Sequence, residues 1–214
     1  MNKENCVIRV EQPQDYREVE NLTREAFWNV YQPGCLEHYV LHCYREQEGF
    51  IPQLSLILEL DGKMIGHVMY AHSHIDLEDG SELPIMTFGP ISIAPPFKRQ
   101  GYGKYLLDYS LSKAAQMGAG AIAMCGNIDF YGKCGFGLAS EKGVRYEDAD
   151  PSDPIVPYFL IRELKKGFLD GIKGTYKDPK PYFIGWEDPE GFAAYDSTFP
   201  YKEKLVTKDQ LRTQ

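Results

Sequence analysis

The sequence predicts a fold of the α/β (α+β) class, in which helices flank a mixed central sheet and an aromatic-rich C-terminal extension follows. Residues 54–60 place a leucine at every second position, which is the pattern of a strand with one strongly apolar face. The turn signals Asp61-Gly62 and Asp79-Gly80 indicate antiparallel β-hairpins. The amphipathic stretch 104–117 lies between two apolar segments, so it indicates a β-α-β crossover and one parallel strand pair.

The other elements are predicted in chain order by the same reasoning. Residues 15–31 are expected to form a helix because Val19, Leu22 and Ala26 fall on one apolar stripe. A second helix is expected after Pro33-Gly34, and Gly118 is expected to end the helix 104–117. The predicted strands are residues 7–10, 54–60, 64–75, 85–94, 119–125 and 155–161, and the predicted helices are 15–31, 36–47, 104–117 and 128–133.

The composition changes from about residue 166 onward. Glycine and proline recur there often enough to interrupt any long regular element, whereas many aromatic side chains supply area for burial. We therefore expect residues 1–165 to form the main domain and residues 166–214 to form an ordered extension packed on this core. The extension either covers part of a functional site or caps an exposed sheet edge.

Bulk properties restrict the class of protein further. The chain has 214 residues, 43% of them hydrophobic and 13% aromatic, which favours a packed globule over disorder. The N-terminus carries no apolar signal-peptide stretch and no run is long enough to cross a bilayer, so we expect no membrane partner. Five cysteines without a Cys-x-x-Cys pair indicate a reduced, cytoplasmic setting. A net charge of −8 disfavours nucleic acid as a partner and is compatible with cationic substrates.

The most informative feature is the basic, glycine-containing run Lys98–Lys104, which joins the strand 85–94 to the helix 104–117. Unpaired N–H groups in such a turn and the positive end of the helix dipole suit a phosphate or pyrophosphate. A P-loop is excluded because Lys98 stands where its first glycine belongs and Tyr105 stands where it needs Ser or Thr. A Rossmann motif is excluded because Leu106 replaces its third glycine.

A second segment, Gly126–Phe136, follows the next strand. Together the two segments resemble the GNAT superfamily of acyl-CoA-dependent N-acetyltransferases. The first is similar to the family's cofactor loop, Gln/Arg-x-x-Gly-x-Gly/Ala, and the second is similar to its following strand and short helix. Lys98 stands at the Gln/Arg position, which keeps a donor but loses planar geometry. The resemblance covers about residues 5–165 and is strongest over 86–137.

The resemblance implies a GNAT-type fold with a mixed, mostly antiparallel central sheet, and acetyl-CoA or another acyl-CoA as cosubstrate. It implies that the backbone of Ile91, Ser92 and Ile93 pairs with the pantetheine arm like an added strand, and that one N–H faces the thioester oxygen. The residues it assigns to the diphosphate are Lys98, Arg99, Gln100, Gly101, Tyr102, Gly103 and Lys104.

Tyr131 is the expected proton donor to the departing thiolate and an expected cofactor contact. Its reference pKa of about 10 exceeds the value of about 8.5 for a thiol, so the phenol is protonated at neutral pH. Asn127 is expected to bond the pantetheine amides, to cap the helix 128–133, or to do both.

The sequence assigns no general base. His72 and His74 lie two residues apart on one strand and share a face, whereas His67 has the opposite parity. Glu82 and Glu37 have no better support.

Another part of the chain contains residue types that can bind a metal. Cys35, His38 and His42 fall on one helix face beside Cys43, but no second ligand pair stands at metal-finger spacing. We therefore interpret this set as a half-buried helix face and expect no metal.

The resemblance thus implies an enzyme that transfers an acetyl or acyl group from acetyl-CoA to a primary amine, by direct transfer in a ternary complex. The expected acceptor is a small molecule, because an aromatic extension suits a compact pocket. The alternative is a catalytically silent module that binds or senses acyl-CoA. The oligomeric state is left open between monomer and homodimer.

Overall fold

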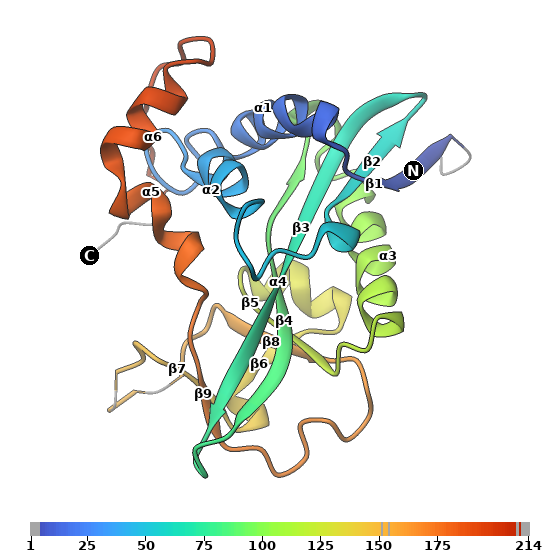
Figure 1. Ribbon diagram of the computed structural model, residues 1–214, viewed down its shortest axis with the longest axis vertical. Coiled ribbons are helices and arrows are strands. Elements are labelled where there is room, and N and C mark those ends of the chain that lie inside the picture. Colours follow the sequence, from blue (N-terminus) through green and yellow to red (C-terminus); the bar gives the residue numbers. More distant parts are fainter. Residues whose placement is uncertain (1–4, 151, 154, 209, 211–214) are drawn as a thin grey trace. The chain divides into compact units, whose positions relative to one another are not determined.

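The computed structural model describes residues 5–150, 152–153, 155–208 and 210 (Figure 1). Within these residues the strands are hydrogen-bonded in the order β1-β2-β3-β4-β5-β8-β6, and β9 pairs with both β3 and β7. β4 pairs with β5 and β7 pairs with β9 in parallel, and the other recorded pairs are antiparallel. The predicted mixed, mostly antiparallel sheet with flanking helices is confirmed.

The element bounds are close to those that the sequence predicts. The strands are β1 (Cys6–Val10), β2 (Leu56–Leu60), β3 (Lys63–Leu77), β4 (Glu82–Ile93), β5 (Ala121–Cys125), β6 (Gly137–Leu138), β7 (Val144–Tyr146), β8 (Phe159–Glu163) and β9 (Gly174–Tyr176). The helices are α1 (Tyr16–Phe27), α2 (Glu37–Tyr44), α3 (Tyr102–Gln116), α4 (Ile128–Tyr131), α5 (Ile184–Glu187) and α6 (Pro189–Asp196).

The chain divides into two compact units. The first unit comprises the described parts of residues 1–69, 90–106 and 180–214, and the second comprises the described parts of residues 70–89 and 107–179. The long strands β3 and β4 and the helix α3 each contribute residues to both units. The predicted boundary at residue 165 stays a prediction, since residues 166–179 cluster with the second unit and the described part of residues 180–214 clusters with the first.

In the first unit, β1, β2 and the beginning of β3 form an antiparallel ladder, and α1 packs beside α2. The buried stripe of α1 includes Val19, Leu22 and Ala26, as the helical period predicts. The C-terminal residues pack on these helices, because the Arg24 guanidinium donates to Asp196 at 2.7 Å and the Tyr39 hydroxyl donates to Asp188 at 2.8 Å. The predicted ordered extension over residues 166–214 stays a prediction.

The second unit is built on a cluster of buried apolar side chains. β5 contributes Ala121 and Ala123 to this cluster, and its antiparallel partner β8 contributes Phe159 and Ile161. These positions alternate along each strand, so one face of β5 and β8 lines the core.

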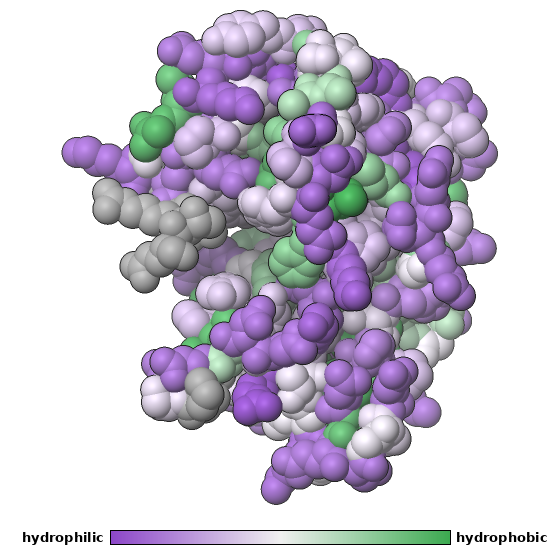
Figure 2. Space-filling model, turned by 60° about the vertical axis from the view of Figure 1, so that its left-hand side comes forward, coloured by the Kyte–Doolittle hydropathy of each residue, from purple (hydrophilic) through white to green (hydrophobic). Residues whose placement is uncertain are grey.

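The molecular surface shown in Figure 2 is mostly hydrophilic, with hydrophobic residues interspersed among polar ones.

Two predicted boundaries are wrong for identifiable reasons. The helix predicted over 15–31 ends at Phe27, because Asn29 adopts a φ of +59° and its backbone N–H donates to the Gly34 carbonyl at 2.9 Å. The late strand begins at Phe159 rather than at residue 155, since Pro157 has no N–H for a strand ladder. None of the described helices has the length and apolar character that a bilayer-spanning helix needs.

Candidate functional site

The end of β4 offers a backbone edge to a ligand. β4 pairs with β5 at Met86 and Thr87, but no later residue of β4 has a recorded β5 partner, although the strand continues to Ile93. The Ser92 side chain is fully buried and its hydroxyl lies 2.9 Å from that of Thr23 on α1. Side chains alternate along a strand, so Ile91 and Ile93, both half-buried, lie on the face opposite Ser92.

The turn between β4 and α3 has the geometry of an anion cradle. Arg99 and Gly101 adopt φ values of +59° and +90°, and residues 98–101 are exposed. The Tyr105 N–H donates to the Gly101 carbonyl at 3.0 Å, so the helical ladder of α3 begins there. The N–H groups of Tyr102 and Gly103 precede that bond and therefore have no partner within the helix. Consecutive amides in such a turn, together with the helix dipole, favour a bound anion.

Two side chains predicted for the diphosphate point elsewhere in the structure. The Lys98 ammonium donates to the Ala26 carbonyl near the end of α1, and desolvation there lowers its pKa. The Gln100 side-chain amide donates to the Pro96 carbonyl at 2.8 Å and so closes the turn on itself. Arg99 and Lys104, the other two basic residues of the run 98–104, are exposed. The cradle is therefore formed mainly by backbone N–H groups, because the side chains of Lys98 and Gln100 point away from it.

Asn127 caps the short helix that follows β5. Its side-chain oxygen accepts the Asp129 N–H at 2.7 Å, and the backbone at Asn127 is extended, as an N-cap requires. The capping role is thus confirmed, whereas the expected bond to pantetheine stays a prediction. The predicted helix 128–133 is α4 over Ile128–Tyr131, followed by a 3₁₀ turn that Gly135 ends with a φ of +82°.

Tyr131 is oriented by aromatic packing at the end of β5. Its half-buried ring contacts Phe130, Phe136 and Phe88, with centroid distances of 4.9, 5.8 and 5.9 Å. A Cβ placed on Gly126 would lie 2.4 Å from the Tyr131 ring, so the absence of a side chain at that position admits the phenol.

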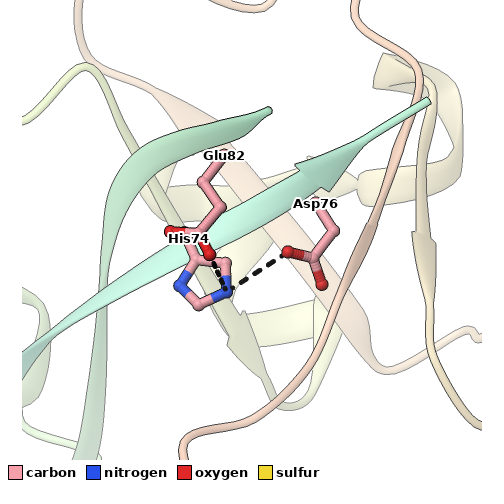
Figure 3. A group of neighbouring side chains, drawn as sticks. All are labelled: His74, Asp76 and Glu82. Carbon is pink, nitrogen blue, oxygen red and sulfur yellow. Dashed lines mark ion pairs between the residues drawn. The ribbon is translucent and has the colours of Figure 1, made fainter. Parts of the chain in front are cut away.

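The histidines considered as bases have different environments. His67 is fully buried, and its Nε2 lies 3.0 Å from the Ser55 hydroxyl. His72 is exposed. His74 Nε2 lies 3.3 Å from Asp76 Oδ1 and 3.9 Å from Glu82 Oε1 (Figure 3). These ion pairs join exposed side chains of the β3-β4 hairpin, and they are not evidence that His74 transfers a proton.

Metal-ligating side chains converge at one place among the described residues, and that is the same His74, Asp76 and Glu82 group. The set weighed from the sequence does not converge in this way. Cys35 Sγ lies 3.5 Å from His38 Nδ1, but the other ring nitrogen of His38 lies 3.0 Å from Asp196, and His42 pairs with Glu20. Cys35 and His38 are buried whereas His42 is exposed, so the set forms a half-buried face, as interpreted from the sequence.

The carboxyl group of Glu37 is held at the start of α2. It accepts the Leu36 N–H at 2.9 Å, and burial raises its pKa to about 7.

The sequence offered no signal for a second group of side chains, which gathers around Asp178. The hydroxyls of Tyr146 and Tyr176 donate to its two oxygens at 2.6 and 3.0 Å, and the Cys125 thiol lies 3.9 Å away. The group draws on β5, β7 and β9, so no spacing along the chain could have indicated it.

A cavity of about 510 Å³ lies elsewhere in the second unit. None of the residues predicted for the cofactor site lines it. The lining residues are Asp76, Leu77, Glu78, Gly143, Arg145, Lys173, Gly174 and Thr175.

Comparison with known proteins identifies the class. The model of the Acetyltransferase (GNAT) family matches residues 16–136, which is more than half of the chain. The protein belongs to this family.

Among curated proteins, the chain is 27% identical over 99 residues to the uncharacterized N-acetyltransferase YjhQ of Escherichia coli K12. That match covers 46% of this chain and 54% of YjhQ, so it spans about half the length of the relative.

Solved structures share the fold. The E. coli GNAT-family N-acetyltransferase YhbS, in complex with CoA, has a TM-score of 0.70 and 23% identity over 83% of this chain and 92% of that one. A GNAT-family acetyltransferase from Brucella melitensis, in complex with acetyl-CoA, has a TM-score of 0.65 and 23% identity over 83% of this chain and 97% of that one.

Proposed function

We propose that this protein transfers an acetyl or other acyl group from acetyl-CoA to a primary amine of a small molecule, by direct transfer in a ternary complex. The observation that carries this proposal is the exposed turn in which Arg99 and Gly101 take positive φ values immediately before α3. Such a turn at a helix N-terminus is a binding element for a diphosphate. The CoA and acetyl-CoA bound to structural neighbours support the same ligand class.

The first unit supplies the groups that we assign to the diphosphate and to the pantetheine arm. In this proposal the amides of residues 99–104 take the diphosphate, and the β4 edge at Ile91–Ile93 pairs with the pantetheine amides. An N–H on that edge donates to the thioester oxygen, where negative charge develops as the amine attacks. The buried hydrogen bond between the Ser92 and Thr23 hydroxyls links β4 to α1, and so it holds the β4 edge in position for the ligand.

Tyr131 completes the proposed chemistry. The amine nitrogen forms a bond to the carbonyl carbon, the carbon–sulfur bond breaks, and the phenol donates a hydrogen bond or its proton to the departing thiolate. A phenol of pKa about 10 transfers its proton uphill to a thiolate of pKa about 8.5, so stabilisation by hydrogen bonding is the larger contribution. The assignment rests on the place of Tyr131 in the motif and on its packing at the end of β5.

Calorimetry with acetyl-CoA and a thiol-release assay with a panel of amines test the proposal. We expect acetyl-CoA to bind, and free thiol to appear only when an amine is present. Binding without thiol release from any amine would instead favour the silent acyl-CoA-binding module. Absence of binding would reject both functions.

Charge reversal tests the placement of the diphosphate. Arg99→Glu should raise the Kd for acetyl-CoA about 10-fold or more, because it puts a negative charge beside the proposed phosphates. Lys63→Glu makes the same charge change at an exposed position at the start of β3 and should leave the Kd within about 2-fold. An equal effect of the two variants would count against the cradle.

A further inference from the structure

The turn between β3 and β4 fixes which side chains meet at the tip of this hairpin. Gly80 has a φ of +84°, as a tight hairpin turn requires. The Leu77 N–H donates to the Ser81 carbonyl at 2.8 Å, so these two residues lie opposite each other. The next pair along the antiparallel ladder is Asp76 and Glu82, whose side chains therefore emerge on the same face.

Asp76 and Glu82 place two negative charges on that face. Like charges directly opposite each other destabilise an antiparallel pair, so this arrangement favours a compensating cation. His74 lies two residues before Asp76 on the same strand and shares the face. Lys177 is close enough for Asp76 to act on it electrostatically, but its ammonium pairs with Glu147 at 2.6 Å. With a neutral imidazole, the group of His74, Asp76 and Glu82 carries a charge of about −2.

The three side chains bring their donor atoms together, as Figure 3 shows. His74 Nε2 lies 3.3 Å from Asp76 Oδ1 and 3.9 Å from Glu82 Oε1, and the donor atoms all lie within 4.8 Å of one another. Zinc bonds nitrogen and oxygen at about 2.1 Å, so two ligands of a tetrahedral zinc ion lie about 3.4 Å apart. The distance between His74 and Asp76 matches this separation, and rotation of the exposed Glu82 side chain can close the longer distance.

The types of donor atom select the class of ion. One imidazole nitrogen and two carboxylate oxygens suit Zn²⁺ and related divalent transition metals, whereas Mg²⁺ and Ca²⁺ prefer ligand sets made of oxygen alone. Two carboxylates also balance the charge of a divalent ion. Three protein ligands leave at least one coordination position open, which is the arrangement of zinc sites that bind water or a further ligand.

The group adjoins the cavity of about 510 Å³ in the second unit, because Asp76 also lines that cavity. Asp76 pairs with Thr175 of β9, and Thr175 pairs with Arg145 of β7, so these three side chains share one face of the sheet. Arg145 and Lys173 give the cavity lining two cationic side chains. An ion bound to Asp76 therefore has space beside it for water or for an anionic ligand.

We propose that His74, Asp76 and Glu82 bind a divalent transition-metal ion of the Zn²⁺ class, which links β3 to β4 at the tip of the hairpin. The imidazole contributes Nε2 in its neutral form, and each carboxylate contributes one oxygen. The three ligands all belong to the second unit, and the inference does not depend on the proposed acetyltransferase function. It departs from the expectation, based on the sequence, that the protein binds no metal.

A calorimetric titration with Zn²⁺ tests the site in the wild type, in His74→Ala and in His72→Ala. His72 is a matched control, because it is an exposed histidine on the same face of β3 and lies outside the ligand group. The wild type and His72→Ala should bind Zn²⁺ with similar Kd values, whereas His74→Ala should raise the Kd about 10-fold or more. Absence of zinc binding by the wild type, or equal binding by wild type and His74→Ala, would overturn the inference.

A second comparison separates ligation from a general attraction of cations to an acidic chain. Asp76→Asn and Glu78→Gln each remove one negative charge from the same hairpin, and Glu78 lies outside the ligand group. Asp76→Asn should raise the Kd for Zn²⁺ about 10-fold or more, and Glu78→Gln should leave it within about 2-fold. Mg²⁺ should bind the wild type at least about 10-fold more weakly than Zn²⁺. Equal losses in the two variants, or equal affinities for the two ions, would reject the site.

Imidazole ¹⁵N resonances of the wild type give a local readout that depends neither on activity nor on a variant. Zn²⁺ should shift the Nε2 resonance of His74 and leave that of His72 in place, and EDTA should reverse the shift. A zinc-dependent shift that spares His74 would place the ion elsewhere and overturn the inference.

Discussion

At the end of β5, the missing side chain of Gly126 and the helix cap of Asn127 both determine where neighbouring residues lie. Gly126 leaves the space that the Tyr131 ring occupies, and Asn127 caps α4 through the Asp129 N–H. A helix of four residues has little stability of its own, so the aromatic contacts of Tyr131 are what fix the phenol.

Replacement of Tyr131 by Phe tests its role at this scale. The variant keeps the ring that packs against Phe130 and Phe136 and removes only the hydroxyl. We expect kcat to fall about 100-fold, because the departing thiolate loses the hydrogen bond of the phenol, with the Kd for acetyl-CoA nearly unchanged. Steady-state kinetics and calorimetry measure the two quantities. Equal rates for variant and wild type would remove the Tyr131 hydroxyl from the mechanism.

At the scale of the element, α3 begins and ends at glycines with left-handed backbone. Gly101 has a φ of +90° before the first turn, and Gly118 has a φ of +95° after the last. The two positions impose similar backbone demands, but only the N-terminal one lies at the positive end of the helix dipole. Stability and ligand binding can therefore be separated by comparing the two ends of one helix.

Gly101→Ala and Gly118→Ala form that comparison. Each should lower stability by about 1 kcal/mol, since alanine disfavours a positive φ. Only Gly101→Ala should weaken acetyl-CoA, by about 5-fold or more, because a distorted turn no longer aims its amides at the diphosphate. Thermal unfolding and calorimetric titration give the two values. Similar Kd values for both variants would show that the turn at Gly101 does not bind the ligand.

At the scale of the whole molecule, the described residues 180–208 and 210 are part of the first unit. Arg24, with a side chain only 2% exposed, pairs with Asp196 at 2.7 Å, and the fully buried His38 lies 3.0 Å from the same carboxylate. Burial lowers the pKa of His38, so the ring is neutral at physiological pH. The Asp196 carboxylate therefore serves chiefly as the partner of Arg24.

Asp196→Asn should destabilise the protein by about 3 kcal/mol, because it leaves the buried Arg24 guanidinium without its counter-charge. Lys202→Gln removes a half-exposed ion pair with Glu25 from the same C-terminal segment and should cost less than about 1 kcal/mol. Differential scanning calorimetry of the two variants measures the contrast. Comparable losses would mean that burial of the Arg24–Asp196 pair adds nothing.

The sequence predicted what local patterns encode. The turn at Gly101, the helix α3 and the cap at Asn127 depend on neighbours within a few residues, and each could be located in advance. The orientation of Lys98 toward Ala26 depends on a residue 72 positions away, and so it was missed. The surroundings of Asp178 were missed for the same reason, since they come from three strands separated along the chain.

Both tryptophans of the chain, Trp28 and Trp186, belong to the first unit. The Trp28 indole N–H donates to the Glu203 carbonyl at 2.9 Å, and the Arg24 guanidinium lies 4.1 Å from the centre of its ring. Intrinsic tryptophan fluorescence is therefore an optical signal of that unit alone, whereas circular dichroism reports helices and strands throughout the chain. Denaturation curves that differ between the two methods would reveal that one half of the protein melts before the other.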